Sequence, residues 1–237
     1  MANYLFIHGG WHGAWCWSRV LPLLEKQRHR PIAIDLPSHG RDRTPTSKVT
    51  MKDYVDAVVA HLDAVPEPVV LVGHSSGGAI ATQAAEERPS KVRSLVYLAA
   101  FLPRNGETIL GLLQQATESA LHGRMIPSAD QTQLTIPDEA LRECFYAGCR
   151  DEDVALAKLC LTPQPIAPAV TPVVTTPGNF GRVPRVYIET LRDRAVPTSF
   201  QRTMREALPC EKVFTLDTDH SPFFSAPEKL AEHLLAV

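Results

Sequence analysis

The sequence lacks the features that mark several protein classes. Its longest apolar runs are strand-sized, far short of a membrane-spanning helix. Neither sign of charge dominates, because the formal net charge is −2 and there is neither a basic run nor an acidic tail. We therefore expect no nucleic acid and no membrane surface as a partner. Cysteine is scarce, with five residues, no Cys-x-x-Cys pair and no zinc-like spacing. This predicts free thiols in a reducing cytoplasm and no metal site.

What is present suits an ordinary globular protein. The 237 residues are 44% hydrophobic and 21% charged, which is enough for one domain with a sizeable core. The first ten residues, MANYLFIHGG, have too short an apolar run and no basic start for a signal peptide. We expect them to form the first strand.

Strand-like apolar runs alternate with helical patterns along most of the chain. Six runs predict strands: Tyr4–His8, Pro31–Leu36, Val69–Val72, Val92–Ala100, Arg185–Leu191 and Lys212–Asp217. Helical spacing covers Trp15–Gln27, Met51–Val65, a stretch opening at Ser76 and a stretch from Pro227 onward. Buried strands separated by helices predict an α/β fold with a mostly parallel, doubly wound sheet. Such sheets bind ligands at the carboxyl ends of their strands.

Residues 103–184 interrupt the alternation, since no convincing strand can be recognised between Pro103 and Pro184. Helical patterns cover Thr108–Leu121, Asp138–Ala147 and Asp151–Leu161, and proline-rich loops join and follow them. We expect residues 103–184 to form a helical cap over a core made of residues 1–102 and 185–237. A peripheral decoration that shapes no pocket is the alternative.

The sequence Gly73-His74-Ser75-Ser76-Gly77 fits the pattern Gly-x-Ser-x-Gly, with an apolar strand before it and a helix after it. In that context a sharp turn lifts the serine hydroxyl out of the sheet edge, toward the positive end of the following helix. The pattern predicts Ser75 as a nucleophile. A purely structural glycine-rich turn is the alternative.

A serine hydroxyl needs a base and an orienting acid, which follow the nucleophile in the order acid, then histidine. Two histidines lie beyond residue 184. His233 falls inside the terminal helix, whereas His220 follows a strand, so we predict His220 as the base. Asp193 follows the preceding strand and is predicted to hold the imidazole. The other acidic candidates lie within that strand or too close to His220 along the chain: Glu189, Asp217 and Asp219.

Two backbone N–H groups are expected to bind the developing oxyanion. One belongs to Ser76, after the nucleophile. The other belongs to Gly10 in the loop after the first strand, where Gly9 makes room for the backbone. His8 is expected to brace this loop as a buried hydrogen-bonded residue. The same structural role is expected for three other histidines: His12, His39 and His74.

The substrate pocket is expected to be apolar and to favour small to medium hydrophobic esters over charged ones. Large side chains near the expected site are the candidate contacts, although each could be ordinary core. The expected substrate-binding residues are five large side chains, Trp11, Phe101, Phe145, Tyr146 and Phe223. Gly9 and Ser221 are added because they are next to Gly10 and His220 in the sequence.

Four segments carry a resemblance to a known family: FIHGGWHGAWCW, VVLVGHSSGG, VYIETLRDRAVPTSFQ and DHSPFFSAPEKLAEHL. The chain resembles the α/β-hydrolase superfamily, and within it the group of plant methyl esterases, plant hydroxynitrile lyases and small bacterial carboxylesterases, some of which hydrolyse pyrethroids. The resemblance implies the α/β-hydrolase fold, a triad of Ser75, Asp193 and His220, oxyanion donors at Gly10 and Ser76, and a cap after the fourth strand.

Two positions separate the branches of that group. The lyases carry a threonine at the position of Gly9 and a lysine at the position of Ser221, after the histidine. The plant methyl esterases typically carry an apolar residue at the latter position. The resemblance therefore implies ester hydrolysis through an acyl-enzyme without a cofactor. Lyase-like or other cofactor-free carbon–carbon chemistry and a small-molecule receptor stay as alternatives, and a homodimer is an untested expectation.

Overall fold

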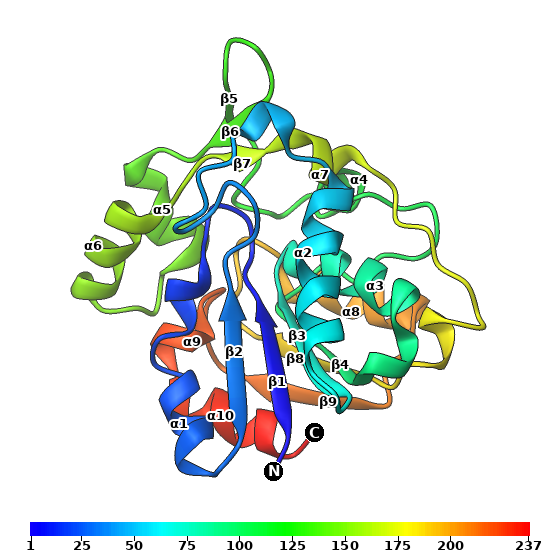
Figure 1. Cartoon of the computed structure of the whole chain (residues 1–237). Helices are drawn as coiled ribbons and strands as arrows, with labels where there is room; N and C mark the ends of the chain where they lie inside the picture. Colours follow the sequence, from blue (N-terminus) through cyan, green and yellow to red (C-terminus); the bar gives the residue numbers. More distant parts are fainter.

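Six parallel strands form one sheet in the order β2-β1-β3-β4-β8-β9 in the computed structural model, which describes residues 1–237 (Figure 1). The strands are β1 (Asn3–Ile7), β2 (Arg30–Ile34), β3 (Val69–His74), β4 (Val92–Leu98), β8 (Arg185–Thr190) and β9 (Lys212–Leu216). Each matches a predicted strand to within about two residues at either end. The predicted doubly wound α/β fold is confirmed.

Helices cover both faces of this sheet, as right-handed crossovers between parallel strands require. On one face lie α1 (Leu21–Lys26), α9 (Pro222–Ser225) and α10 (Pro227–Leu235). On the other lie α2 (Met51–Ala64), α3 (Gly77–Glu87) and α8 (Thr198–Ala207). Three short 3-10 turns complete the main fold, η1 (Ala14–Trp17), η2 (Thr46–Lys48) and η3 (Pro89–Lys91), and a fourth, η4 (Phe180–Arg182), lies shortly before β8.

The helical prediction for Trp15–Gln27 was too simple. The segment divides into η1 and α1, and Pro22 occupies the first turn of α1. Proline is tolerated there because the first N–H groups of a helix have no partner within it, whereas further inside a longer helix it would remove a bond. Helix α8 was not predicted, and its apolar side chains Phe200 and Met204 pack into the core.

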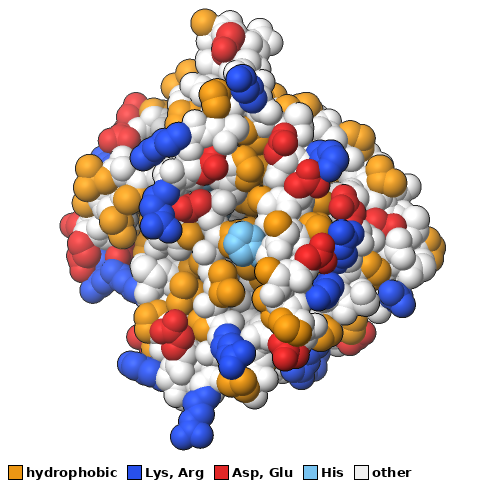
Figure 2. Space-filling view, viewed as in Figure 1, with side chains coloured by type: hydrophobic (Ala, Val, Ile, Leu, Met, Phe, Trp, Pro, Cys, Tyr) orange, Lys and Arg blue, Asp and Glu red, His pale blue; other side chains and the backbone are white.

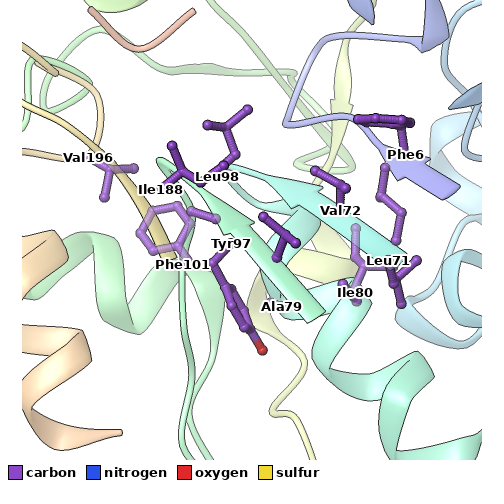
Figure 3. Close-up of a cluster of buried hydrophobic side chains, with 14 of the residues drawn as sticks. Phe6, Leu71, Val72, Ala79, Ile80, Tyr97, Leu98, Phe101, Ile188 and Val196 are labelled. Carbon is purple, nitrogen blue, oxygen red and sulfur yellow. The ribbon is translucent and has the colours of Figure 1, made fainter. Parts of the chain in front are cut away.

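The core is centred on the two central strands and on α3, the helix between them, and it extends into the helices of both faces. Strand β3 is buried at every position, because both faces of the sheet are covered. Figure 3 shows Leu71 and Val72 of β3 near Ala79 and Ile80 of α3, beside Tyr97 of β4. This packing makes the turn between β3 and α3 a rigid platform at the carboxyl edge of the sheet.

Residues 103–184, called the insertion below, lie between β4 and β8, and most of them sit beyond the carboxyl ends of the strands (Figure 1). Its last part returns along α3, where the Thr176 and Phe180 N–H groups donate to Glu86. Its helices are α4 (Ile109–Gln115), α5 (Asp138–Phe145), α6 (Asp151–Cys160) and α7 (Ile166–Val170). It also contains a three-stranded antiparallel sheet of β5 (Ile126–Pro127), β6 (Gln133–Thr135) and β7 (Gln164–Pro165). The expectation that this region holds no strand was wrong, because strands of two or three residues are too short to show alternation.

An ion pair fastens the insertion to the rest of the molecule. The carboxylate of Asp153 in α6 is almost fully buried and pairs with Arg19, which lies between η1 and α1. A buried carboxylate needs such a partner to offset its lost hydration.

No helix of the structure has both the length and the apolar character needed to cross a membrane.

Candidate active site

Ser75 occupies the turn between β3 and α3 in a backbone conformation that non-glycine residues rarely adopt. Its φ of 53° lies in the left-handed region. Two hydrogen bonds hold the turn: the Ser75 N–H donates to Leu98 O at 3.2 Å, and the Phe101 N–H donates to Ser75 O at 3.0 Å. Strained residues persist where the surroundings over-determine them, and such strain clusters at functional sites.

The glycines around this turn are required by close packing. A Cβ at Gly73 would lie 2.6 Å from the Gly77 carbonyl oxygen, and a Cβ at Gly77 would lie 2.6 Å from the His8 carbonyl oxygen. At Gly78 the corresponding distance, to the Phe101 carbonyl oxygen, is 2.4 Å. Only glycine lets the strand, the turn and the helix approach this closely.

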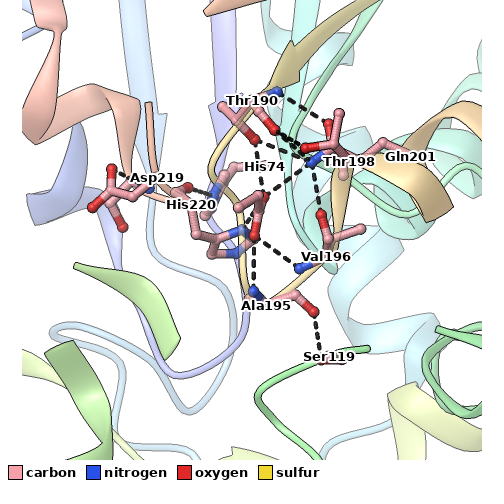
Figure 4. Close-up of polar contacts among 12 residues, drawn as sticks. His74, Ser119, Thr190, Ala195, Val196, Thr198, Gln201, Asp219 and His220 are labelled. Atoms are coloured by element: carbon pink, nitrogen blue, oxygen red, sulfur yellow. Dashed lines mark hydrogen bonds and ion pairs between the residues drawn. The ribbon is translucent and has the colours of Figure 1, made fainter. Parts of the chain in front are cut away.

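The structure brings His220 and Asp193 together, although they follow different strands. The His220 Nδ1–H donates to Asp193 Oδ2 at 2.8 Å, and both side chains are buried. Asp193 is itself held by its surroundings, since its Oδ1 accepts the N–H groups of Ala195 and Val196 at 2.8 and 2.9 Å (Figure 4). This arrangement fixes the tautomer of His220 and leaves its Nε2 free to take a proton.

His74 joins the His220 loop to the serine turn. Its Nε2–H donates to the carbonyl oxygen of His220 at 2.9 Å, and the two rings lie 4.6 Å apart between centroids (Figure 4). Burial and the neighbouring histidines lower the pKa of His74 well below its usual value, so the ring stays neutral. Since His74 directly precedes Ser75, these contacts hold the imidazole of His220 against the serine turn.

The loop after β1 is braced by two of the four buried histidines predicted to be structural, His8 and His12. His8 Nδ1–H donates to Gly9 O at 2.8 Å, while the Leu36 N–H donates to His8 Nε2 at 3.1 Å. His12 Nδ1–H donates to Gly10 O at 2.7 Å. Burial is the main cause that lowers the pKa of both rings, to about 3 for His12. Neutral rings satisfy these bonds and fix the carbonyl groups of the loop.

Two backbone N–H groups of the site have no hydrogen-bond partner in the molecule, those of Gly10 and Ser76. Both residues line the same cavity as Ser75. Unpaired N–H groups at a buried position are costly unless a ligand or water satisfies them. Together with the positive end of α3, they form a site suited to a negatively charged oxygen next to the Ser75 hydroxyl.

The cavity over Ser75 is small and apolar, and no charged side chain lines it. It encloses about 50 Å³. The main fold contributes Gly10, Trp11, Tyr54, Ser75, Ser76, Ile80 and Phe101 to its wall. The insertion contributes Ile109, Leu110, Leu113, Leu121, Met125, Leu134, Gln164, Pro168 and Ala169. A neutral, hydrophobic ligand suits this wall, since a charged one would lose its hydration without a partner.

The expected substrate contacts divide into two groups. Trp11 and Phe101 line the cavity. The other five lie behind its wall: Gly9, Phe145, Tyr146, Ser221 and Phe223. Gly9 is packed against Ser75, since a Cβ there would lie 2.7 Å from the Ser75 Cβ. Phe145 and Phe223 pack around His12, and Tyr146 Oη–H donates to His12 Nε2 at 2.7 Å. The side chains of Phe145, Tyr146 and Phe223 thus pack around His12, and substrate contact by these five residues stays a prediction.

Sequence reasoning missed most of the wall supplied by the insertion. Tyr54 and Gln164 carry its polar side chains outside the serine turn, yet neither belongs to a recognisable motif. Tyr54 lies on the buried face of α2, where its apolar neighbours suggest ordinary core. The apolar spacing of Thr108–Leu121 was the one signal for the wall, since α4 supplies Ile109, Leu110 and Leu113.

Comparison with known proteins places this geometry in a family. Residues 4–233 match the model of the alpha/beta hydrolase family. A putative chloroplastic methylesterase 15 of Arabidopsis thaliana is 34% identical in an alignment of 249 positions that covers 99% of this chain but 56% of that protein. The chain thus spans little more than half of that relative. Methylesterase 9 of the same plant is 31% identical, over 100% of this chain and 98% of its own.

A solved structure agrees with these relatives. The pyrethroid hydrolase of Sphingobium faniae superposes with a TM-score of 0.90 at 30% identity, covering 99% of this chain and 96% of that one. The family match covers nearly the whole chain, including the six strands and the serine turn described above. This chain belongs to the alpha/beta hydrolase family.

Proposed function

We propose that the protein is a serine hydrolase that cleaves small to medium hydrophobic carboxylic esters through an acyl-enzyme. The observation that carries the proposal is the strained Ser75 at the wall of an apolar cavity, beside the unpaired N–H groups of Gly10 and Ser76. The buried pair of His220 and Asp193 supplies the base and its orienting acid. The similarity to methylesterases and to a pyrethroid hydrolase supports ester hydrolysis.

In this mechanism, His220 Nε2 takes the hydroxyl proton as Ser75 Oγ attacks the ester carbonyl carbon. The N–H groups of Gly10 and Ser76 bind the oxyanion of the tetrahedral intermediate. His220 then gives the proton to the leaving alcohol, which departs and leaves Ser75 acylated. A water molecule, deprotonated by His220, attacks the acyl carbon, and the acid is released as the proton returns to Ser75.

Two features favour hydrolysis over the lyase chemistry of the resembling plant enzymes. Gly9 leaves no room for the threonine found in those lyases, because even a Cβ would lie 2.7 Å from the Ser75 Cβ. Ser221, at the position of their lysine, is fully buried and its hydroxyl has no hydrogen-bond partner. A cyanide leaving group would therefore find neither the extra hydroxyl nor the positive charge.

We further propose that the insertion acts as a cap over the core of residues 1–102 and 185–237. Nine of the residues that line the cavity belong to the insertion, which supports a role in shaping the pocket and excluding water. The five cysteines are unpaired, which supports a reducing compartment such as the cytoplasm. A homodimer stays a prediction, to be checked by sedimentation velocity.

The test is the release of nitrophenol from p-nitrophenyl esters of increasing acyl length. The wild type should turn them over, while Ser75→Ala should keep the fold and lose activity by several orders of magnitude. Ser90→Ala, at an exposed serine in η3, is the matched control and should behave as the wild type. A folded Ser75→Ala protein with wild-type turnover would refute the mechanism, and a preference for charged esters would refute the substrate class.

A further inference from the structure

Trp11, the residue after the proposed oxyanion donor Gly10, is held in a strained conformation by the insertion. Its φ of 63° lies in the left-handed region. All its polar groups bond to the insertion: the N–H to Gln164 Oε1 at 3.2 Å, the carbonyl oxygen to the Thr162 N–H at 2.9 Å, and the indole N–H to Leu134 O at 2.9 Å. The geometry of the oxyanion loop therefore depends on residues about 120 to 150 positions further along the chain.

Gln164 belongs to a closed circuit of buried side chains. His39 Nε2–H donates to Gln164 Oε1 at 3.1 Å, Gln164 Nε2–H donates to Tyr54 Oη at 3.3 Å, and Tyr54 Oη–H donates to His39 Nδ1 at 3.3 Å. All three side chains are buried. A neutral His39 with its proton on Nε2 satisfies the three side-chain bonds, and the Pro37 carbonyl oxygen, which lies 3.1 Å from Nδ1, then receives no proton from the ring. Burial lowers the pKa of His39 and favours the neutral ring. Together with the Pro165 carbonyl oxygen, which accepts the Gln164 Nε2–H at 3.1 Å, the circuit fixes which end of the Gln164 amide faces the loop.

The fixed amide oxygen lies directly over Gly10. A Cβ at Gly10 would be 3.2 Å from Gln164 Oε1 and 3.6 Å from Ser76 Oγ. Because Gln164 Oε1 accepts the Trp11 N–H, the loop presents the Gly10 N–H to the cavity while the neighbouring N–H is occupied. Without that acceptor, the strained peptide between Gly10 and Trp11 loses one of the bonds that hold its orientation.

We propose that Gln164, oriented by His39 and Tyr54, is a positioning residue that sets the Gly10 N–H for transition-state binding. This inference rests on the proposed ester hydrolysis and deepens it. Oxyanion stabilisation depends on donors aimed at the place where charge develops, so a small change of orientation weakens the transition state more than the bound substrate.

The experiment compares Gln164→Leu with the wild type on a p-nitrophenyl ester. Since misplacing reacting groups by about 1 Å costs about 100-fold, we expect kcat to fall by about 10- to 100-fold while KM changes less than about twofold. A trifluoromethyl ketone, whose carbonyl becomes an oxyanion when Ser75 adds to it, should bind more weakly by the same factor. The methyl ketone of the same chain, assayed as a simple competitive inhibitor, should bind equally well to both proteins.

Gln133→Leu is the matched control. Gln133 lies on the neighbouring strand β6 and also ties the insertion to the main fold, since its Oε1 accepts the Thr46 hydroxyl at 2.8 Å, but it does not touch the oxyanion loop. Its kcat should stay at the wild-type value. An equal loss in Gln133→Leu, an unchanged or higher kcat in Gln164→Leu, or an effect on KM alone would overturn the positioning role.

A second variant covers the case in which Gln164→Leu does not fold. Tyr54→Phe removes only the hydroxyl that holds the Gln164 amide. It must therefore also lower kcat with little change in KM, by a smaller factor than Gln164→Leu. An unchanged kcat in Tyr54→Phe would overturn the proposal. Turnover by the wild type and its loss in Ser75→Ala test the hydrolase function separately. If the wild type is active and Gln164→Leu keeps the same kcat, the positioning role is refuted and the proposed function still stands.

Discussion

His12 shows how one residue supports the site by staying uncharged. Its ring is buried, its Nδ1–H holds the Gly10 carbonyl and its Nε2 accepts the Tyr146 hydroxyl. Burial, with a smaller contribution from His220 and His39, lowers its pKa from 6.5 to about 3. The unfolded chain therefore binds a proton at His12 between these two values while the folded protein does not. Stability from this residue is fully present above pH 6.5 and is lost as the pH falls toward 3.

We predict that His12→Gln lowers stability at neutral pH but makes it less sensitive to acid. The destabilisation relative to the wild type should shrink by about 1.4 kcal/mol for each pH unit below the unfolded pKa. Urea unfolding from neutral pH to about pH 4 measures this slope. Tyr146→Phe removes the same hydrogen bond but keeps the titrating ring, so its slope should match the wild type. Parallel slopes for His12→Gln and the wild type would contradict the assignment.

At this scale, sequence reasoning succeeds where a side chain belongs to a local pattern. The tight turn at Ser75 was predictable because the glycines that permit it are its neighbours in the chain, and each proves to face backbone within 3 Å. Gln164 was not predictable, because its partners Trp11, Tyr54 and His39 come from three distant segments. The catalytic roles of Ser75, Asp193 and His220 stay predictions until activity is measured, although the structure joins Asp193 and His220 by a hydrogen bond.

Among the helices and strands, α3 has the position on which the geometry of the site depends most directly. Its first residues pack against the end of β4 so closely that a Cβ at Gly78 would lie 2.4 Å from the Phe101 carbonyl oxygen. The neighbouring atom belongs to the backbone, which cannot move aside for an added Cβ as the end of a flexible side chain could. Displacing α3 would move both Ser75 and the Ser76 N–H, because these two residues directly precede its first turn.

We predict that Gly78→Ala destabilises the protein by about 1–3 kcal/mol, as overpacking does in well-packed cores, and also lowers esterase activity. Gly178→Ala is the matched control, because nothing lies within 4 Å of its added Cβ. That variant should stay within about 0.5 kcal/mol of the wild type. Urea unfolding and the nitrophenyl assay check both effects. A Gly78→Ala protein as stable as Gly178→Ala would mean that α3 can shift freely.

The helices and strands also show which parts of the fold can be predicted from sequence patterns. The six strands of the large sheet were found because four to seven apolar residues in a row leave a clear signal. The strands β5, β6 and β7 were missed, since their pairing is set by contacts between segments as distant as Gln133 and Pro165. The small sheet inside the insertion was therefore missed, and the bounds of the insertion stay a prediction.

For the whole molecule, charge is spread without a dominant sign. Lys, Arg, Asp and Glu side chains are interspersed over the face shown in Figure 2, in keeping with the formal net charge of −2. The cavity wall holds no charged side chain. Neither the long-range field nor the site therefore attracts a charged ligand.

We predict that kcat/KM for a neutral ester changes less than about twofold between about 0.01 M and about 0.5 M salt. Electrostatic steering would instead give a steep fall in rate over this range, because salt screens long-range attraction. Stopped-time assays with one neutral p-nitrophenyl ester at several salt concentrations are sufficient. Because a neutral ester has no net charge to be steered, a strong salt dependence would mean that salt acts on the enzyme's own charges near the site, against an uncharged cavity wall.

The place of the insertion has a consequence for how the chain is made. Strand β4 needs β8 as its neighbour, but residues 99–184 must leave the ribosome before β8 does. At about 5–20 residues per second, the delay is on the order of ten seconds. During that time the unpaired edge of β4, whose residues Leu95–Leu98 are buried in the finished fold, is open to pairing with other nascent chains. Slow translation through the insertion should therefore raise the demand for chaperones during synthesis.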